Sequence, residues 1–329
     1  MNGTRISGVG AALPARRVTN AELARSLDLT EQWIVERTGI AERRIVSGDE
    51  SGCSLATEAA RRALDHAGVS ASDVDWLIVA TVTPDLRLPS AACLIAAALG
   101  SGAAAVDLNA GCSGFLCGLA QADALVSSGA ARVVLVVGVD LMSRIIDLSD
   151  PKTGILFGDG AGAAVVTATE PPARLGPFVI HSDGGHPELL HAPAGAGKVS
   201  MVGREVYKRA VQGMVTSLEE LLATAAVPLE AIDLVVAHQA NGRILEAVAE
   251  RLALPPEKVF SNIERYGNTS AASIPIALAE AHAQGAMREG DLIALSAFGS
   301  GFVWGAGLAR WDATPNEAPA LATTGGARA

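Results

Sequence analysis

Residues 227–237 read Val-Pro-Leu-Glu-Ala-Ile-Asp-Leu-Val-Val-Ala, a turn followed by an apolar run, and they come directly after residues 206–225, which have helical apolar spacing. The same order occurs earlier, where a helix-like segment at 54–68 leads through a turn into the apolar run 74–80. The two copies share Val69 with Val227 and Asp75 with Asp233, each pair at an offset of 158 positions. We therefore predict an internal repeat.

The repeat continues past the first helix and strand. A loop and helix at 112–128 precede the strand Val133–Val139, and a loop and helix at 268–284 precede the strand Leu292–Ala297. Strands that are apolar throughout are buried on both faces, so helices must cover both sides of each sheet. We expect an α/β fold, a duplicated α/β/α/β/α sandwich with two mixed central sheets.

The repeat also sets the expected domain boundaries. Regular structure breaks at residues 167–175, Thr-Ala-Thr-Glu-Pro-Pro-Ala-Arg-Leu, which separates a first half, 1–170, from a second half, 171–312. Residues 313–329 are small, contain Pro and Gly, and have no periodicity. We expect a flexible tail there.

The composition excludes several classes of protein. Half of the 329 residues are apolar and only 18% are charged, which is typical of a compact interior and not of a disordered chain. No apolar stretch approaches the roughly 20 residues of a membrane span, and no secretory signal precedes the first apolar residues, so we expect a cytoplasmic protein that does not bind membranes. The formal charge of −10 argues against nucleic acid as a partner.

Four cysteines lie in the first 117 residues without paired spacing, so we expect reduced thiols, no disulfide framework and no metal site. Cys112 differs from the other three because it lies directly before the helix-like run 116–128, between Gly111 and Gly114. The positive end of a helix dipole favours a thiolate, and flanking glycines let a substrate carbonyl approach the backbone. Cys112 is the candidate nucleophile.

Two polar segments of the second half are candidates for the same site. His238 opens His-Gln-Ala-Asn at 238–241, after a buried strand, where open α/β sheets place their sites. Asn268 lies in Gly-Asn-Thr-Ser at 267–270 and corresponds to Cys112 in the repeat, at an offset of 156. Equivalent loops of a repeat are expected to meet at one centre, although a hydrogen-bonded histidine and a helix-capping asparagine are the alternatives.

Two glycine-rich segments are less specific. The segment Gly158–Gly162 precedes a strand-like run and not a helix, so we interpret it as a hairpin turn and not as a phosphate-binding loop. The segment Phe298–Gly305 follows a predicted strand, and its backbone N–H groups are candidate donors to an oxyanion.

Together these motifs resemble the β-ketoacyl-[acyl carrier protein] synthase III family, and residues 33–44 resemble its N-terminal signature. The motifs are Gly111–Gly114, His238–Asn241, Gly267–Ser273, Gly158–Ala163 and Phe298–Gly305. The resemblance extends nearly to Trp311. It implies the thiolase-like fold, a homodimer, and an acyltransferase that uses a coenzyme A thioester as substrate and needs no cofactor.

The resemblance also implies residue roles. Cys112 takes an acyl group from coenzyme A, and His238 with Asn268 serves decarboxylative condensation with malonyl-[acyl carrier protein], in fatty acid or polyketide priming. The backbone N–H groups of Cys112 and Ser300 form the oxyanion hole. The remaining roles fall to Trp33, Arg37 and Asn241 for coenzyme A, and to Lys208, Arg243 and Arg251, with Arg209 a further candidate, for an acidic carrier protein.

Two positions depart from the family pattern. Residues 150–153 read Asp-Pro-Lys-Thr where many members carry an arginine beside the adenine, and Leu88 stands at the acyl-pocket gate where an aromatic residue is common. The acyl donor and its chain length stay open. An acyltransferase that moves the acyl group to another acceptor without condensation is the alternative function, although Asn268 favours condensation.

Overall fold

The computed structural model describes residues 2–195, 197–312 and 322–324. Its two main sheets have equivalent strand orders, as the repeat predicts. In the first sheet the order is β1 (Gly3–Pro14), β7 (Asp159–Thr169), β6 (Val133–Leu141), β4 (Trp76–Ala80) and β5 (Ala104–Leu108). In the second it is β8 (Leu175–Ser182), β14 (Val303–Arg310), β13 (Leu292–Gly299), β11 (Leu234–Ala237) and β12 (Val259–Phe260).

Both sheets are mixed. Strand β4 is parallel to β5 and β6, and β7 is antiparallel to β6 and β1. The second sheet repeats this pattern with β11, β12, β13, β14 and β8. The aspartates of the repeat have equal roles, because Asp75 accepts a hydrogen bond from the N–H of Val133 at 3.0 Å and Asp233 from that of Leu292 at 2.8 Å. The predicted duplication is confirmed.

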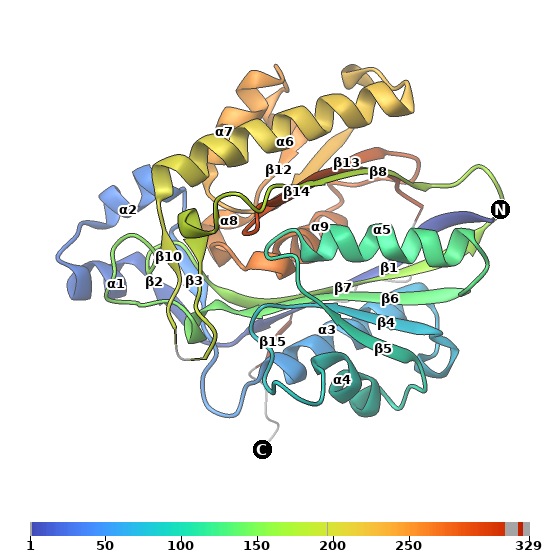
Figure 1. Ribbon diagram of the computed structural model, residues 1–329, viewed down its shortest axis with the longest axis horizontal. Coiled ribbons are helices and arrows are strands. Elements are labelled where there is room, and N and C mark those ends of the chain that lie inside the picture. The colour runs from blue at the N-terminus through green and yellow to red at the C-terminus, as the bar shows by residue number, and fades with distance from the viewer. Residues whose placement is uncertain (1, 196, 313–321, 325–329) are drawn as a thin grey trace.

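Three layers of helices alternate with the two sheets (Figure 1). The central layer is α5 (Gly114–Ser127) and α9 (Ser273–Ala283), and the outer layers are α3 (Gly52–Ala67) with α4 (Ala91–Leu99), and α6 (Gly203–Ala225) with α7 (Gly242–Arg251). The remaining elements flank one end: α1 (Asn20–Leu27), α2 (Glu31–Thr38), α8 (Ile263–Tyr266), β2 (Arg17–Thr19), β3 (Glu42–Arg44), β9 (Leu190–His191) and β10 (Ser200–Met201).

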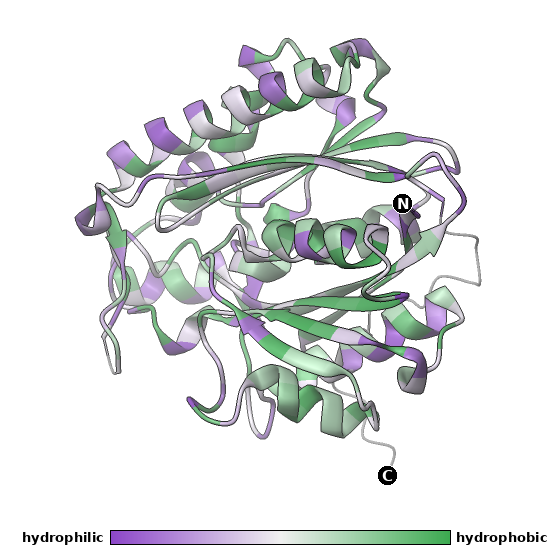
Figure 2. Ribbon diagram, turned by 45° about the vertical axis from the view of Figure 1, so that its right-hand side comes forward, coloured by the Kyte–Doolittle hydropathy of each residue, from purple (hydrophilic) through white to green (hydrophobic). Residues whose placement is uncertain are grey.

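The central helices are buried between both sheets, which explains their apolar sequences. Phe115 and Leu119 of α5 pack with Ile274 and Leu278 of α9 in one core cluster that includes strands of both halves. Figure 2 shows α5 as predominantly hydrophobic, whereas α6 carries hydrophilic residues along its length. The central layer therefore joins the halves into one core and leaves the N-terminal ends of α5 and α9 to meet inside the molecule.

Two predictions need correction. The segment Gly158–Gly162 is not a hairpin turn, because β7 begins at Asp159 and pairs on both sides. Its glycines serve a close approach instead, since a Cβ atom at Gly162 would lie 2.8 Å from the backbone nitrogen of Ile276 in α9.

The predicted tail also contains regular structure. Residues Ala322–Thr324 form a strand, β15, parallel to β1, because the edge of β1 offers backbone groups for pairing. Residues 313–321 and 325–329 lie outside the described part of the chain. Among the described helices, none has the length and apolar character required to cross a membrane.

Candidate active site

Cys112 lies between β5 and α5, two residues before the helix begins at Gly114. Its loop packs tightly against the loop after β13, because a Cβ atom at Gly299 would lie 2.7 Å from the Cys112 nitrogen and one at Gly111 would lie 3.0 Å from the Ser300 nitrogen. Glycine is therefore required on both sides of this contact. The arrangement brings the two predicted oxyanion donors, the N–H groups of Cys112 and Ser300, to neighbouring loops.

The Cys112 sulfur is in a low-dielectric environment. Burial raises the pKa of its thiol to about 11, and the negative charge of Asp140 contributes in the same direction. A hydrogen bond from the Ser270 hydroxyl, with 3.4 Å between Oγ and Sγ, opposes this shift. The resting side chain is thus a thiol, and its ionisation depends on the groups that surround the sulfur.

His238 follows β11 and is held by its backbone, since its N–H donates to the Ser296 carbonyl oxygen at 2.8 Å. The side chain is 1% exposed, and burial lowers its pKa to about 3. His238 is therefore neutral near pH 7 and carries one N–H donor. Its Nδ1 atom has no hydrogen-bond partner among the described residues.

Asn268 is fixed between two segments of backbone. Its N–H donates to the Leu156 carbonyl oxygen at 2.8 Å, and its own carbonyl accepts from the Gly158 N–H at 3.0 Å. The side-chain oxygen accepts from the Ser270 N–H at 2.9 Å, and Nδ2 donates to the Ala240 carbonyl oxygen at 3.3 Å. These bonds orient the amide so that its second N–H remains available to another acceptor.

The three side chains line one cavity of about 1120 Å³, with Cys112 contributed by the first half and His238 and Asn268 by the second. The site therefore forms where the loops of the two repeats meet, as the sequence predicts. Ser300 lines the same cavity.

Four exposed basic residues also line this cavity, whereas none of its described lining residues is acidic. We call these four residues, Arg37, Lys152, Arg204 and Arg243, the cationic mouth. In a chain of formal charge −10 this local excess of positive charge points to an anionic ligand.

The residues predicted to contact coenzyme A lie at the same opening. Trp33 and Arg37 stack on each other, with the guanidinium carbon 4.4 Å from the centre of the indole ring. Asn241 also lines the cavity, but its side chain already caps α7 by accepting from the Arg243 N–H at 2.9 Å and donates to the Arg37 carbonyl oxygen at 3.1 Å. The amide of Asn241 thus has a structural role as well.

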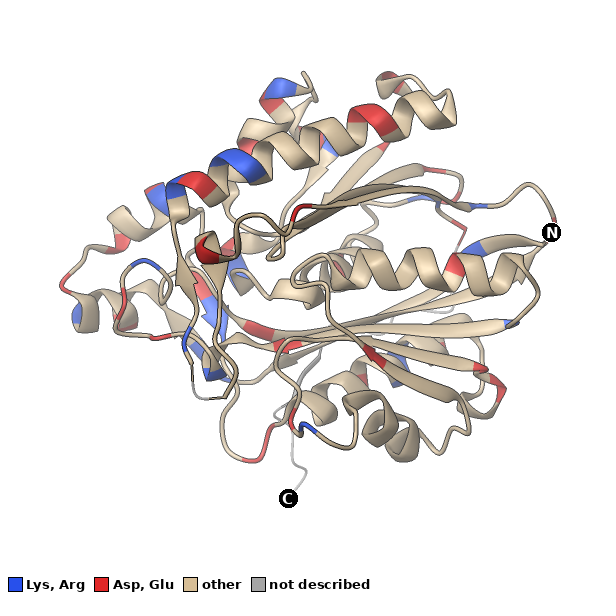
Figure 3. Cartoon of the chain, in the orientation of Figure 1, with Lys and Arg blue, Asp and Glu red and all other residues tan. Residues whose placement is uncertain are grey.

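The residues predicted to bind the carrier protein are more dispersed. Arg243 lines the cavity, whereas Lys208 on α6 pairs with Glu205 at 3.0 Å and Arg251 on α7 contacts Gln212 at 3.3 Å, both outside the lining. Figure 3 shows basic residues on α6 at the end beside β10. Arg209, also on α6, pairs with Asp183 at 3.4 Å.

Leu88 does not line the cavity of its own chain. It lies in the loop between β4 and α4, is 84% exposed, and has the exposed neighbour Leu86. Its predicted role at an acyl pocket therefore stays a prediction.

The lining residues that the sequence analysis did not single out include Arg204, Lys152 and Ser270. Arg204 and Lys152 are isolated charges in the sequence, and Ser270 belongs to the motif that was selected for Asn268. The repeat contains the missing signal, since the offset of 158 that relates Asp75 to Asp233 leads from Cys112 to Ser270. The described residues contain no group of three or more potential metal-binding side chains.

The fold and the site define a class of protein: a duplicated α/β sandwich with a cysteine before the central helix and a histidine and an asparagine from the other half, all lining one cavity. Comparisons with known proteins agree. Residues 106–184 match the family model for 3-oxoacyl-[acyl-carrier-protein] synthase III, and residues 222–311 match the model for the C-terminal part of that enzyme.

Three similar proteins extend this match to nearly the whole chain. A β-ketoacyl-[acyl-carrier-protein] synthase III from Novosphingobium aromaticivorans is 47% identical, over 93% of this chain and 98% of its own. The crystal structure of the synthase III from Aquifex aeolicus superposes with a TM-score of 0.92 at 47% identity and covers 94% of this chain and 100% of its own. The crystal structure of the priming β-ketosynthase of the R1128 polyketide pathway has a TM-score of 0.91 at 36% identity and covers 95% of this chain and 98% of its own. The chain belongs to the 3-oxoacyl-[acyl-carrier-protein] synthase III family.

Proposed function

We propose that the chain transfers an acyl group from acyl-coenzyme A to Cys112 and condenses it with malonyl-[acyl carrier protein], which releases carbon dioxide and primes a fatty acid or polyketide chain. The observation that carries this proposal is the meeting of Cys112, His238 and Asn268 in a cavity with a cationic mouth and no described acidic lining. Phosphates of coenzyme A and of a carrier-bound pantetheine are the matching anions.

The first step makes a covalent intermediate. The Cys112 sulfur attacks the thioester carbonyl, the bond to the coenzyme A sulfur breaks, and the thiol proton leaves with that sulfur as coenzyme A is released. The N–H groups of Cys112 and Ser300 are the proposed donors to the tetrahedral oxyanion. No cofactor enters this reaction, since coenzyme A is the leaving group of the substrate.

The second step forms the carbon–carbon bond. Loss of carbon dioxide from the malonyl thioester leaves an enolate, whose oxygen accepts hydrogen bonds from neutral His238 and from the Asn268 amide. The enolate carbon attacks the acyl carbonyl on Cys112, and the Cys112 thiolate leaves. Burial of His238 supports this role, because a neutral imidazole still carries one N–H, which can donate a hydrogen bond to the enolate oxygen.

The same proposal includes two protein partners. Arg243, Lys208 and Arg251 lie on adjoining helices beside the cavity, where they would steer an acidic carrier protein. A second copy of the chain is the other partner. Strand β5 pairs only with β4 among the described strands and exposes Val106. The next residue of β5, Asp107, accepts from the Ala91 N–H at 2.9 Å, at the start of the helix that follows the Leu88 loop.

Intact-protein mass spectrometry with a panel of acyl-coenzyme A donors tests the acylation step. We expect an acyl adduct on the wild type, its loss in Cys112→Ala, and its retention in Cys117→Ala, which removes a half-buried thiol from α5. Addition of malonyl carrier protein should then yield a 3-oxoacyl carrier with release of carbon dioxide. Transfer of the acyl group without carbon dioxide release would support the acyltransferase alternative, and acylation of Cys112→Ala would refute the proposed nucleophile.

A further inference from the structure

Ser270 contacts the nucleophile directly. It begins the short helix Ser270–Ala272, is 1% exposed, and lines the cavity. Its hydroxyl donates to the Cys112 sulfur with 3.4 Å between Oγ and Sγ. Its backbone has a φ of +52°, in the left-handed region that costs a residue with a side chain about 1 kcal/mol. The surrounding structure must therefore hold Ser270 in place.

Asn268 and Asp140 supply this support. The Ser270 N–H donates to the Asn268 side-chain oxygen at 2.9 Å, and the next N–H along the chain, that of Ala271, donates to the Asp140 carboxylate at 3.2 Å. Strand β6 approaches this segment closely, since a Cβ atom at Gly138 would lie 2.3 Å from the Ala271 carbonyl oxygen. The conformation of Ser270 is thus fixed from both sides.

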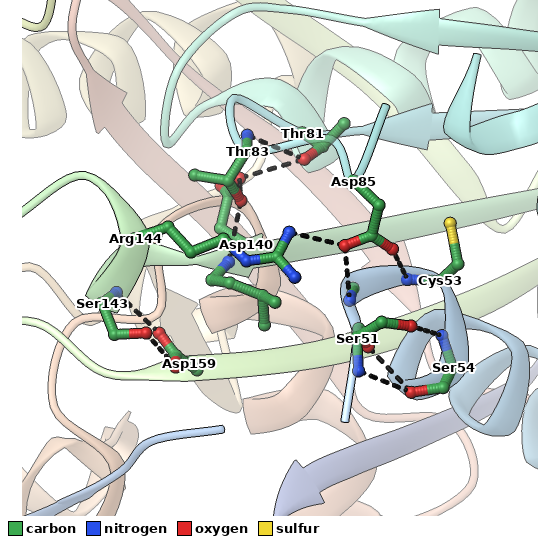
Figure 4. A network of polar contacts seen from close by, with 12 residues as sticks. Ser51, Cys53, Ser54, Thr81, Thr83, Asp85, Asp140, Ser143, Arg144 and Asp159 are labelled. Atoms are coloured by element: carbon green, nitrogen blue, oxygen red, sulfur yellow. Dashed lines mark hydrogen bonds and ion pairs between the residues drawn. The ribbon is translucent and has the colours of Figure 1, made fainter. Parts of the chain in front are cut away.

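Asp140 is itself anchored from several directions. It lies in β6 and is fully buried, and its Oδ1 accepts from the Thr81 and Thr83 hydroxyls at 3.1 Å each and from the Val82 N–H at 2.8 Å (Figure 4). These bonds connect the loop after β4 to β6 and to the segment that carries Ser270. A carboxylate with so many donors is a rigid anchor.

We propose that Ser270 is a further catalytic residue, whose hydroxyl stabilises the Cys112 thiolate when it attacks the donor and when it leaves the acyl group, and that Asp140 is the residue that positions Ser270. A thiolate accepts a hydrogen bond much more strongly than a thiol, so this bond strengthens where charge develops. Ser270 keeps its own proton throughout.

The charges around the sulfur show why such a donor matters. Burial raises the pKa of Asp140, and hydrogen bonds from Val82, Ser270 and Ala271 oppose that rise and favour the carboxylate. The carboxylate in turn raises the pKa of the Cys112 thiol, and His238 beyond β11 is neutral because burial lowers its pKa to about 3. Neither group stabilises a thiolate by charge. The Ser270 hydroxyl and the backbone around Cys112 are what oppose the effect of burial.

Alkylation of Cys112 by iodoacetamide, followed on its peptide across pH 6 to 10.5, tests the proposal on the full chain. In Ser270→Ala the profile of alkylation rate against pH should shift to higher pH, and alkylation at pH 8 should slow about tenfold, the effect of one hydrogen bond to a charged group. Ser270→Gly removes the same hydroxyl and tolerates a positive φ, so it should slow alkylation by a similar factor. Ser273→Ala, which removes a buried hydroxyl that faces Thr269, is the control.

The outcomes separate catalysis from structure. Wild-type reactivity in both folded Ser270 variants overturns the proposal, as does equal slowing in Ser273→Ala. The substrate role of Ser270 rests on the proposed function, but iodoacetamide needs no substrate. A failure of acyl-coenzyme A to load Cys112 therefore leaves the alkylation result intact.

Asp140→Asn tests the positioning role with a result of opposite sign. Loss of the negative charge alone would lower the pKa of the thiol and speed alkylation, whereas loss of the hydrogen bonds that the Ala271 N–H and the Ser270 side chain make to the carboxylate would displace Ser270 and slow it. We expect slowing, and we expect Ser270→Ala to add little to it, because one interaction cannot be lost twice. Faster alkylation of Asp140→Asn would show that Asp140 acts on Cys112 by charge alone.

Discussion

At the scale of single residues, the buried state of His238 makes a prediction about condensation. Its pKa of about 3 keeps the imidazole neutral from pH 5 to pH 8, so protonation of His238 should leave no step in the rate of condensation over that range. His238→Ala removes one donor to the enolate oxygen and should slow decarboxylation of malonyl carrier protein by about 10² to 10³. Carbon dioxide release measures this effect.

The same variant distinguishes the two steps. Because the proposed oxyanion donors are the Cys112 and Ser300 backbone groups, His238→Ala should still acylate at Cys112. Loss of acylation in this variant would mean that the histidine acts on the nucleophile and not on the malonyl group.

The residues of the site were not equally predictable from sequence. Cys112, His238 and Asn268 occur in short motifs at loop positions, so their residue types alone indicate chemistry. Ser270 is ordinary by composition, and its value arises from a contact with a residue 158 positions away. Leu88 illustrates the opposite case, since a family position can be matched by sequence although its own chain leaves it exposed.

At the scale of elements, a histidine of the outer helix α3 stacks on a histidine of the central helix α9 beside β1, whose Val9 N–H donates to His66 at 3.1 Å. The rings of His66 and His282 have centres 4.5 Å apart, and Trp311 lies 5.4 Å from His282. Burial lowers the pKa of both imidazoles, that of His282 to about 4. The unfolded chain therefore binds more protons than the folded chain below pH 6.5, and stability is lost as the pH falls from there toward 4.

Thermal unfolding at pH 7.5 and pH 5.5 checks this expectation. His282→Gln should lose less stability between the two pH values than the wild type, by about 1 kcal/mol or a few degrees, a figure reduced for partial solvent exposure. His186→Gln, in an exposed loop, supplies the baseline for removal of a histidine. An identical pH dependence in His282→Gln and wild type would exclude the stacked pair as its source.

Element boundaries followed from the sequence wherever apolar periodicity was long. The helices predicted at 54–68 and 206–225 begin within three residues of α3 and α6. The start of β7 differs from the turn predicted at 158–162, because glycines often mark turns in a sequence. Here Gly162 instead allows the close contact between β7 and α9. Such a contact between distant segments has no local signature.

At the scale of the whole molecule, an exposed apolar edge requires an explanation. Strand β5 ends the first sheet, Val106 is 40% exposed, and the nearby loop exposes Leu86 at 48% and Leu88 at 84%. An unprotected edge strand with apolar side chains readily pairs with another chain. Pairing with a second copy would continue the sheet across the interface and direct Leu88 of each chain toward its partner.

Sedimentation equilibrium tests this arrangement. The wild type should have twice the chain mass of 33.4 kDa. Val106→Asp should dissociate it, because like charges would face each other across a two-fold axis. Val35→Asp introduces the same charge at a site on α2 with the same exposure of 40%, and it should leave the mass unchanged. If the wild type has the mass of a single chain, the proposed dimer is wrong and Leu88 cannot reach the acyl pocket of a partner. In that case Leu88→Phe should leave the preference for acyl-chain length unchanged.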